Sequence, residues 1–495
     1  MRNYNRIIYV VLLLGLFSCS EDYFDVNRPS GTADVEQLRI NDLLAPVIYH
    51  TVQGQYSAEL SYGNYVQNFA GQGGTAAGET TAAGLWNNVY LYALPNIETI
   101  KDKADETGAT HYAAIADILK AINLGIATDS WDFIPLSQAS LGEDNLFPDF
   151  DSQENVYSVI FDLLDGAIAD LEAEDTSAIS IGREDLVYGG DDNIDKWLRA
   201  AYTLKARYQL HLVNKGVVSP GEVLTTIENG FTSNSDDFQI SYDDRNINPR
   251  YSQEILARNT GNFHNVLASQ IVSSMNGDYY PFESDALEID PRLPVFGEID
   301  NPEDDEWKGY VSGGGGLAPD GTAANVQFAT GGYYTSVDAP IVIITYAEAQ
   351  FIKAEAEFLA NGGTTTSSGT TEAGYQAYLE GIMASMAKYG VDGTAYINDP
   401  AVDVGAENLM LNHIMKEKYI HNFLNPETFV DFRRYDFSDE VFTGLTIREE
   451  GDSDGDFAGQ WFRRATYPAT EINRNGDMVL QYQQTPVTPV WWDAE

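Results

Sequence analysis

Residues 345–359 read Thr-Tyr-Ala-Glu-Ala-Gln-Phe-Ile-Lys-Ala-Glu-Ala-Glu-Phe-Leu, and this stretch is the clearest helix signal in the chain. Thr345 and Glu348 have the Thr-x-x-Glu spacing of a capping box, in which each side chain accepts a hydrogen bond from the other residue's backbone N–H. Alanines and phenylalanines then share one face, and the Asn-Gly-Gly run at 361–363 is typical of a helix end. The stretch predicts a helix that presents small side chains to a close neighbour.

Helical spacing of apolar residues continues through most of the chain. A partner helix is expected at 372–389, where large aromatic residues face the alanines of the first helix. Such pairs resemble those of tetratricopeptide arrays, although the chain has no strict 34-residue repeat. Further helices are expected at 35–53, 85–106, 110–128, 155–174, 194–215 and 412–423. Pro95 should kink or break the second of these. The sequence therefore predicts a mostly α fold.

Two regions lack this periodicity. Residues 56–84 are rich in Tyr, Gly and Gln, and residues 275–340 combine Tyr, Trp and a run of four glycines. Long loops without a period of their own are usually functional or mobile in a compact domain. We therefore expect a ligand to bind at these two regions.

The lone cysteine follows a secretory signal pattern. Two arginines precede an apolar run at 7–17 that is too short to span a bilayer. Leu16-Phe17-Ser18-Cys19 resembles a bacterial lipobox, after which Cys19 would become the diacylated first residue of the mature chain. The alternative is ordinary secretory cleavage with Cys19 as a bystander, although an unpaired thiol is unusual in an exported protein. We expect a signal peptide at 1–18, lipidation of Cys19 and a tether at 19–35.

The chain is strongly acidic and rich in aromatic residues. It contains 75 acidic and 28 basic residues, a net charge of −47, and 12 % of its residues are aromatic. The electrostatic field of such a negative charge repels nucleic acid, which argues against DNA or RNA binding. The aromatic content argues against a disordered chain, because folded proteins use these residues in cores or ligand platforms. A single cysteine excludes internal disulfides and cysteine-based metal sites.

Motifs of the common catalytic classes are missing from the sequence. It has no Gly-x-Ser-x-Gly, Walker loop or His-Glu-x-x-His, whereas a glycosidase-type carboxylate pair stays open among so many acids. Residues 452–456 resemble the start of a calcium loop, but Arg463 replaces its last ligand, and a solvated acidic turn is the alternative. His413, Glu417 and His421 share a helix face, yet the two imidazoles lie about 12 Å apart along the axis. We expect no cofactor and no metal, with calcium as the exception left open.

An ordered set of short motifs follows the lipobox. They are Leu85-Trp86-Asn87-Asn88-Val89-Tyr90, Asp290-Pro291-Arg292-Leu293, the core of 345–359, Glu427-Thr428-Phe429-Val430-Asp431-Phe432-Arg433-Arg434 and Arg464-Ala465-Thr466-Tyr467-Pro468-Ala469-Thr470-Glu471. In this order and spacing, the chain resembles the SusD/RagB family of Bacteroidetes outer-membrane lipoproteins over nearly its whole mature length. The acidic residues after Cys19 also resemble the surface-export signal of that phylum.

The resemblance implies both a fold and a function. The expected fold is a single mostly α domain over 36–495, with a tetratricopeptide-like helix-pair scaffold and an irregular, loop-rich ligand-binding half. The expected protein is not an enzyme but a lipid-anchored outer-membrane protein facing the cell exterior. It would capture a nutrient, usually an oligosaccharide, and act as a lid for a SusC-like TonB-dependent β-barrel transporter.

The residues of the two irregular regions suit such a ligand. Sugar rings stack on Tyr and Trp through their CH faces, and their hydroxyls need polar partners at the rim. The candidate ligand-binding residues are Tyr62, Tyr65, Gln67, Trp307, Tyr310 and Tyr333, with packing inside the loops as the alternative for each. Arg433 and Arg434, beside Asp431, are interpreted as structural ion pairs. A surface glycoside hydrolase, a peptide-binding protein and an adhesin stay open as other function classes.

Overall fold

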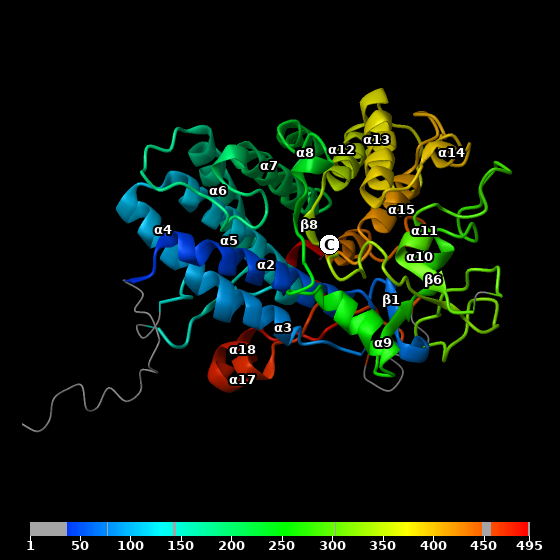
Figure 1. Cartoon of the computed structure of the whole chain (residues 1–495), viewed down its shortest axis with the longest axis horizontal. Coiled ribbons are helices and arrows are strands. Elements are labelled where there is room, and N and C mark those ends of the chain that lie inside the picture. The colour runs from blue at the N-terminus through cyan, green and yellow to red at the C-terminus, as the bar shows by residue number, and fades with distance from the viewer. Residues whose placement is uncertain (1–36, 77, 142–144, 302, 448–456, 494–495) are drawn as a thin grey trace, which may run out of the picture.

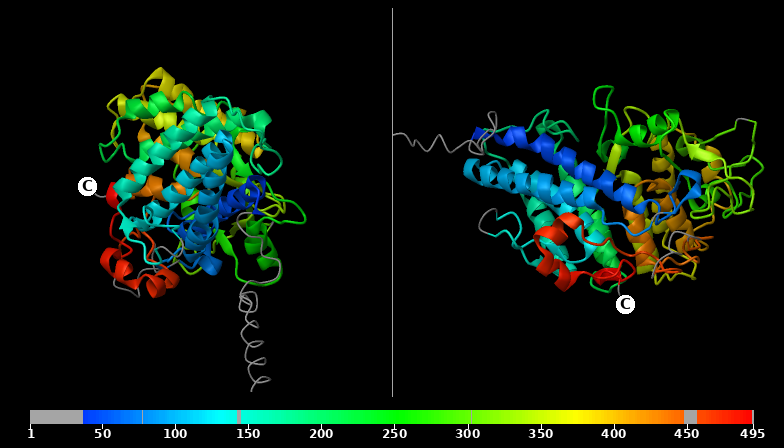
Figure 2. Two further views of the ribbon diagram at one scale, coloured as in Figure 1. Left: turned by 90° about the vertical axis from the view of Figure 1, so that its left-hand side faces the viewer. Right: turned by 90° about the horizontal axis from the view of Figure 1, so that it is seen from below.

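The structure is a computed structural model that describes residues 37–76, 78–141, 145–301, 303–447 and 457–493. Helices dominate it and strands are short, which confirms the mostly α fold. Long helices occupy one half of the molecule, and short strands and loops occupy the other (Figures 1 and 2). The expected signal peptide, the lipidated Cys19, the tether and the 452–456 run lie outside the described residues.

The helical half is built from elements that pack on one another in chain order. They are α4 (Leu94–Thr107), α5 (Thr110–Trp131), α6 (Gln153–Glu172), α7 (Ile194–His211), α8 (Pro220–Ile227), α12 (Tyr346–Ala360) and α13 (Glu372–Tyr389). Each of them contacts the next, so successive pairs share one core. Two further helices, α15 (Leu411–His421) and α16 (Glu427–Arg434), pack against α12 and α7.

The first expected helix is longer than its apolar pattern indicates. α2 (Ile40–Tyr62) replaces the helix expected at 35–53 and continues into the region expected to be irregular. Tyr56, Glu59 and Tyr62 are all buried on its last two turns. A glutamate such as Glu59 is expected to be exposed to solvent, but its carboxylate forms a buried ion pair with Arg250. The last turns of α2 were therefore not predicted, because a charged residue is buried where an apolar one would have continued the pattern.

The helix expected at 85–106 changes type at its middle. α3 (Ala83–Trp86) leads into a π-helical segment, η4 (Asn87–Ala93), and α4 begins there with Pro95 in its first turn. Proline lacks a backbone N–H, so the first turn of a helix tolerates it. The helix is not broken at Pro95, because residues 83–107 stay helical and change from π to α type just before the proline, and a kink at Pro95 stays a prediction.

Half of the predicted capping box of α12 is wrong. The Thr345 hydroxyl accepts a hydrogen bond from the Glu348 backbone N–H at 3.1 Å, as expected. The Glu348 carboxylate does not return to Thr345 but accepts two hydrogen bonds from the Arg207 guanidinium, at 2.7 and 2.6 Å. Because Glu348 is fully buried, a charged partner from another helix stabilises its carboxylate better than one backbone amide.

The loop-rich half contains a four-stranded antiparallel sheet in the order β1 (Phe69–Gly71), β5 (Asn265–Leu267), β7 (Val326–Phe328) and β6 (Gly297–Ile299). Two-stranded pairs form between β4 (Phe238–Ile240) and β8 (Ile341–Ile344), and between β2 (Ile134–Pro135) and β3 (Phe150–Asp151). The chain also contains further short helices. They are η8 (Tyr251–Leu256), α9 (Ala257–Asn259), α10 (Ser269–Ser273), α11 (Leu293–Phe296), α14 (Thr394–Ile397), α17 (Ala469–Arg474) and α18 (Gly476–Tyr482).

One continuous cluster of buried apolar side chains reaches from Ile40 to Trp492. Trp197 is fully buried within it, and its indole N–H donates to Asp185 at 3.0 Å. Within the described ranges, no helix has both the length and the apolar character that crossing a bilayer requires.

Candidate ligand-binding cleft

A cleft of about 690 Å³ opens in the loop-rich half. Three segments line it, residues 273–289, 305–309 and 318–320, so nearly all of its wall comes from the irregular region 275–340. Its volume lies within the roughly 300–1,000 Å³ of small-molecule sites. Two aromatic residues, Trp307 and Tyr279, are part of this wall. We call it the Trp307 cleft.

The main chain of Trp307 is fixed by its neighbours. The Asn276 side-chain amide donates to the Trp307 carbonyl oxygen at 2.9 Å and to Asp278 Oδ2 at 2.8 Å. Gly309 permits a close approach to α10, because a Cβ there would lie 2.7 Å from the Ser269 Cα. The Trp307 side chain nevertheless stays only half-buried. The cleft therefore has a partly open indole on a constrained backbone.

Tyr279 is held by a glycine on a distant loop. Gly444 has a φ of +80°, and a Cβ at this position would lie 2.5 Å from the Tyr279 ring. The Tyr279 backbone N–H donates to the Ser273 carbonyl at 3.0 Å. Burial raises the pKa of the Tyr279 phenol, so the hydroxyl stays a donor at neutral pH. Trp307 and Tyr279 together provide the apolar faces and the donor that sugar recognition needs.

Lys308, the only basic residue among the described residues of the lining, is paired with acids of the same cleft. The Lys308 ammonium lies 2.8 Å from Glu306 and 3.1 Å from Asp320. The hydroxyl and backbone N–H of Thr322, and then Lys308, hold the pKa of the Asp320 carboxyl at about 2. The Asp320 carboxylate is therefore charged at neutral pH, and Lys308 is committed to this carboxylate and to Glu306.

Two of the predicted tyrosines lie in the core. Tyr62 is 2 % exposed and stacks on Phe429 with ring centroids 4.7 Å apart. Tyr65 is 1 % exposed, and its hydroxyl donates to the Gly78 carbonyl at 2.9 Å. Both side chains are packed inside the protein, which was the alternative interpretation. Tyr62 is the last residue of α2, and Tyr65 follows it by about one turn.

The remaining predicted residues are dispersed. Gln67 is buried, and its side-chain amide donates to the Thr446 carbonyl at 2.7 Å. Tyr310 belongs to a small separate cluster of buried apolar side chains, and Tyr333 is half-buried with Lys388 Nζ 5.6 Å from its ring centroid. Of the six predicted residues, only Trp307 lines the cleft, and ligand contact by the other five stays a prediction.

The irregular region at 56–84 lines a different cavity. This second cavity has a volume of about 450 Å³ and lies between residues 60–76 and 253–265. Its lining is uncharged, and the Phe263 side chain in its wall is 58 % exposed. Phe263 was missed because it lies outside both irregular regions. We call this second cavity the Phe263 cavity, and it is the alternative location for a ligand.

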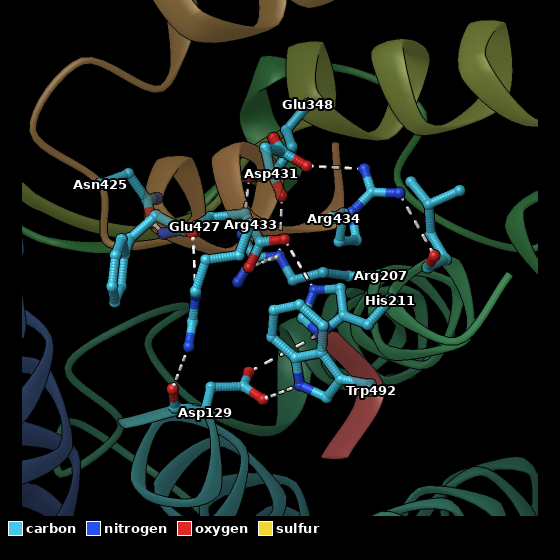
Figure 3. Close-up of polar contacts among 12 residues, drawn as sticks. Asp129, Arg207, His211, Glu348, Asn425, Glu427, Asp431, Arg433, Arg434 and Trp492 are labelled. Atoms are coloured by element: carbon cyan, nitrogen blue, oxygen red, sulfur yellow. Dashed lines mark hydrogen bonds and ion pairs between the residues drawn. The ribbon is translucent and has the colours of Figure 1, made fainter. Parts of the chain in front are cut away.

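A buried polar network joins α5, α7 and α16 (Figure 3). His211 Nε2 lies 2.7 Å from Glu427 Oε1, and the Trp492 indole N–H donates to Asp129 Oδ1 at 2.8 Å. Burial favours the neutral form of Glu427, but His211 and Arg207 prevail and hold the pKa of this carboxyl at about 2. All of these side chains are buried, so the network serves the fold, and Asp129, Arg207 and Glu427 border a small internal cavity of about 40 Å³.

The two arginines at the end of α16 bind different kinds of partner. Arg434 Nη2 lies 2.7 Å from Asp431, which confirms a structural ion pair (Figure 3), and it lies at the same distance from Glu355. Arg433 does not pair with Asp431. Its guanidinium donates to the backbone carbonyls of Asp129 and Arg463 at 2.7 and 2.9 Å. Arg433 therefore anchors two backbone segments, which corrects the interpretation for this residue.

The side chains considered for a metal point to separate partners. Glu417 binds Arg292 at 2.6 Å, and His421 Nε2 lies 2.7 Å from the Thr345 hydroxyl. Burial lowers the pKa of His413 to about 4, and its Nδ1 accepts a hydrogen bond from Met410 N. In the part of the chain that the structure describes, no three His, Cys, Asp or Glu side chains are grouped to hold a metal ion.

Comparisons with known proteins agree with this architecture. A family model described as starch-binding and associating with the outer membrane matches residues 32–468. No curated protein matches the chain. Solved structures similar to it include a SusD/RagB family protein from Bacteroides thetaiotaomicron, with a TM-score of 0.69 and 22 % identity over 92 % of this chain and 99 % of that one. A chitin-binding SusD homologue from Flavobacterium johnsoniae has a TM-score of 0.68 and 21 % identity, with 92 % and 99 % coverage.

Proposed function

Because the chain belongs to the SusD-like family, described as starch-binding and associating with the outer membrane, we propose that it binds a glycan in the Trp307 cleft. The observation that carries this proposal is the half-buried Trp307 in a cleft of about 690 Å³. A flat indole in an open cleft suits a sugar ring, which buries its CH face and keeps its hydroxyls solvated. The protein acts by binding and not by catalysis.

Trp307→Ala should weaken glycan binding roughly 30-fold or more, since a central aromatic anchor contributes at least about 2 kcal/mol. The measurement is isothermal titration calorimetry with the best ligand from an array that includes starch-derived and chitin-derived oligosaccharides. The loss of affinity should come with only a small fall in the thermal unfolding temperature, because the Trp307 side chain is half-buried and packs on the edge of the core.

Phe263→Ala is the matched test of the alternative cavity, and Tyr92→Ala, 42 % exposed outside both cavities, is the control. Loss of binding in Phe263→Ala with none in Trp307→Ala would move the site to the Phe263 cavity. Hydrolysis of the glycan by the wild-type protein would instead support an enzyme, and binding of peptides alone would support a peptide receptor.

We further propose that the protein acts with a SusC-like TonB-dependent β-barrel transporter and covers it as a lid. Family membership supports this partnership, because a bound nutrient needs a route through the outer membrane. A mild-detergent pull-down from the native outer membrane should recover a large β-barrel in a 1:1 ratio, identified by mass spectrometry. Recovery of the lipoprotein alone, under conditions that preserve a known transporter pair, would contradict this partnership.

The proposed membrane attachment is a diacyl anchor on Cys19, with the protein on the cell exterior. Cys19→Ser should abolish incorporation of a labelled fatty acid and release the protein from the membrane fraction, because two acyl chains provide the stable attachment. Surface protease treatment of intact cells tests the orientation. Unchanged labelling in Cys19→Ser would refute the lipid anchor.

A further inference from the structure

Five carboxylate side chains surround the Trp307 cleft. They are Asp278, Glu288, Asp305, Glu306 and Asp320, and all five residues are exposed. Among the residues that the structure describes, Lys308 is the one basic residue of the lining. Five carboxylates against one ammonium leave four negative charges around a single ligand-sized space.

The single cation is not available to a ligand. Lys308 Nζ contacts Glu306 at 2.8 Å and Asp320 at 3.1 Å, and it also donates to the Thr322 hydroxyl at 3.1 Å. An ammonium has three donors, and these three contacts use all of them. A carboxylate or sulfate on a ligand would have to displace an existing ion pair to reach it.

Two of the carboxylates are free to face a ligand. Among the described residues, Glu288 and Asp305 have no hydrogen-bond or ion-pair partner. Their oxygens accept hydrogen bonds from sugar hydroxyls or from an amine, whereas they repel an anionic group. The net charge of −47 adds a long-range field of the same sign.

We infer that the Trp307 cleft takes neutral or amine-bearing glycans and rejects polyanionic ones such as uronate or sulfated polysaccharides. This inference rests on the proposed function and adds the class of glycan. It assigns the selectivity chiefly to the carboxylates of Glu288 and Asp305, because Lys308 offsets one of the two charges at Glu306 and Asp320 and the Asn276 amide donates to Asp278. Trp307 provides the affinity, and the acidic rim decides which sugars approach it.

The test compares one glycan in two charge states. The probe is the best neutral oligosaccharide found on a mixed array of neutral, aminated, uronate and sulfated glycans, and its counterpart has the C6 hydroxymethyl groups oxidised to carboxylates. The oxidised form should bind at least roughly tenfold more weakly at low salt, and raising the salt to about 0.5 M should reduce the difference by screening.

The double variant Glu288→Gln/Asp305→Asn should restore several-fold of the lost affinity for the oxidised glycan. Its matched control, Glu174→Gln/Asp244→Asn, makes the same charge change at exposed residues outside the cleft and should restore none. This comparison separates an effect of the rim from an effect of total charge.

The outcomes distinguish the two proposals. Uronate or sulfated glycans that bind tightly and depend on Trp307 would overturn the charge selectivity and leave the glycan-binding function intact. Equal rescue by the control variant would also overturn the role of the rim. An array without any Trp307-dependent signal would overturn the proposed function, and the selectivity would fall with it.

Discussion

Arg207→Met is expected to lower the free energy of unfolding by about 3–5 kcal/mol, the usual cost of leaving a buried charge unpaired. Arg207 on α7 donates twice to the Glu348 carboxylate on α12, and once to the Ile343 carbonyl at 2.8 Å. Glu348 is fully buried and Arg207 is 5 % exposed. Methionine keeps the length of the side chain and removes its charge and donors. The Glu348 carboxylate therefore loses both hydrogen bonds from Arg207, and the Ile343 carbonyl keeps its hydrogen bond from the Asn425 amide at 3.2 Å.

The measurement is urea unfolding followed by far-ultraviolet circular dichroism. Lys205→Met is the matched control on the same helix, since Lys205 pairs with the exposed Asp165 at the surface. Exposed ion pairs contribute about 0–1 kcal/mol, so this control should unfold near the wild-type midpoint. Similar shifts of the unfolding midpoint in the two variants would show that burial of the Arg207–Glu348 pair adds nothing to stability.

The loss in Arg207→Met should also depend on pH. Burial raises the pKa of Glu348 above its ordinary value of 4.5, and Arg207 opposes that shift. Without Arg207 the folded-state pKa rises further, so the folded protein binds a proton that the unfolded chain releases, and stability falls as pH rises above about 4.5. The destabilisation measured at about pH 7.5 should therefore exceed that at about pH 5.5. A constant difference between these pH values would contradict a buried, unpaired Glu348.

Glu348 also illustrates how far local sequence reasoning reaches. Thr345 and Glu348 predicted the start of α12 correctly, because the Thr345 cap depends on neighbours in the chain. The carboxylate of Glu348 binds a residue 141 positions away, and no local pattern contains that information. Most long helices were predicted for the same reason, since their apolar spacing is local, whereas η4 and the last turns of α2 depend on tertiary packing.

For the candidate site, too, the sequence predicted what depends on local signals and missed what depends on contacts between distant residues. Composition alone made Trp307 a candidate ligand-binding residue, because aromatic residues in a long aperiodic loop are conspicuous, and the structure places it in the wall of a cleft. The sequence left burial of Tyr62 and Tyr65 open as an alternative but could not decide it, since their burial follows from α2 continuing past the buried Glu59 and from contacts with Phe429 far along the chain. Asn276 and Gly444, which hold Trp307 and Tyr279, acquire their roles only once distant loops meet.

Phe351→Ala should destabilise the protein by about 3–5 kcal/mol, the range for removing a fully buried phenylalanine. Phe351 is fully buried on α12 and faces Gly381 of α13. A Cβ on Gly381 would lie 2.7 Å from a ring carbon of Phe351, so the two helices meet through a ring packed directly on a glycine. The cavity left by alanine would lie at this contact, and urea unfolding measures its cost.

A double-mutant cycle tests whether the Phe351 ring itself requires glycine at 381. Gly381→Ala in the wild type combines a gain of about 1 kcal/mol in helix propensity with an overpacking cost of about 1–3 kcal/mol, so it should be neutral or destabilising. In a Phe351→Leu background the smaller side chain frees the space for the methyl group, and the same substitution should then stabilise the protein. The two substitutions should therefore couple by at least about 1 kcal/mol. Equal effects of Gly381→Ala in the two backgrounds would show that the helices adjust their spacing without regard to this ring.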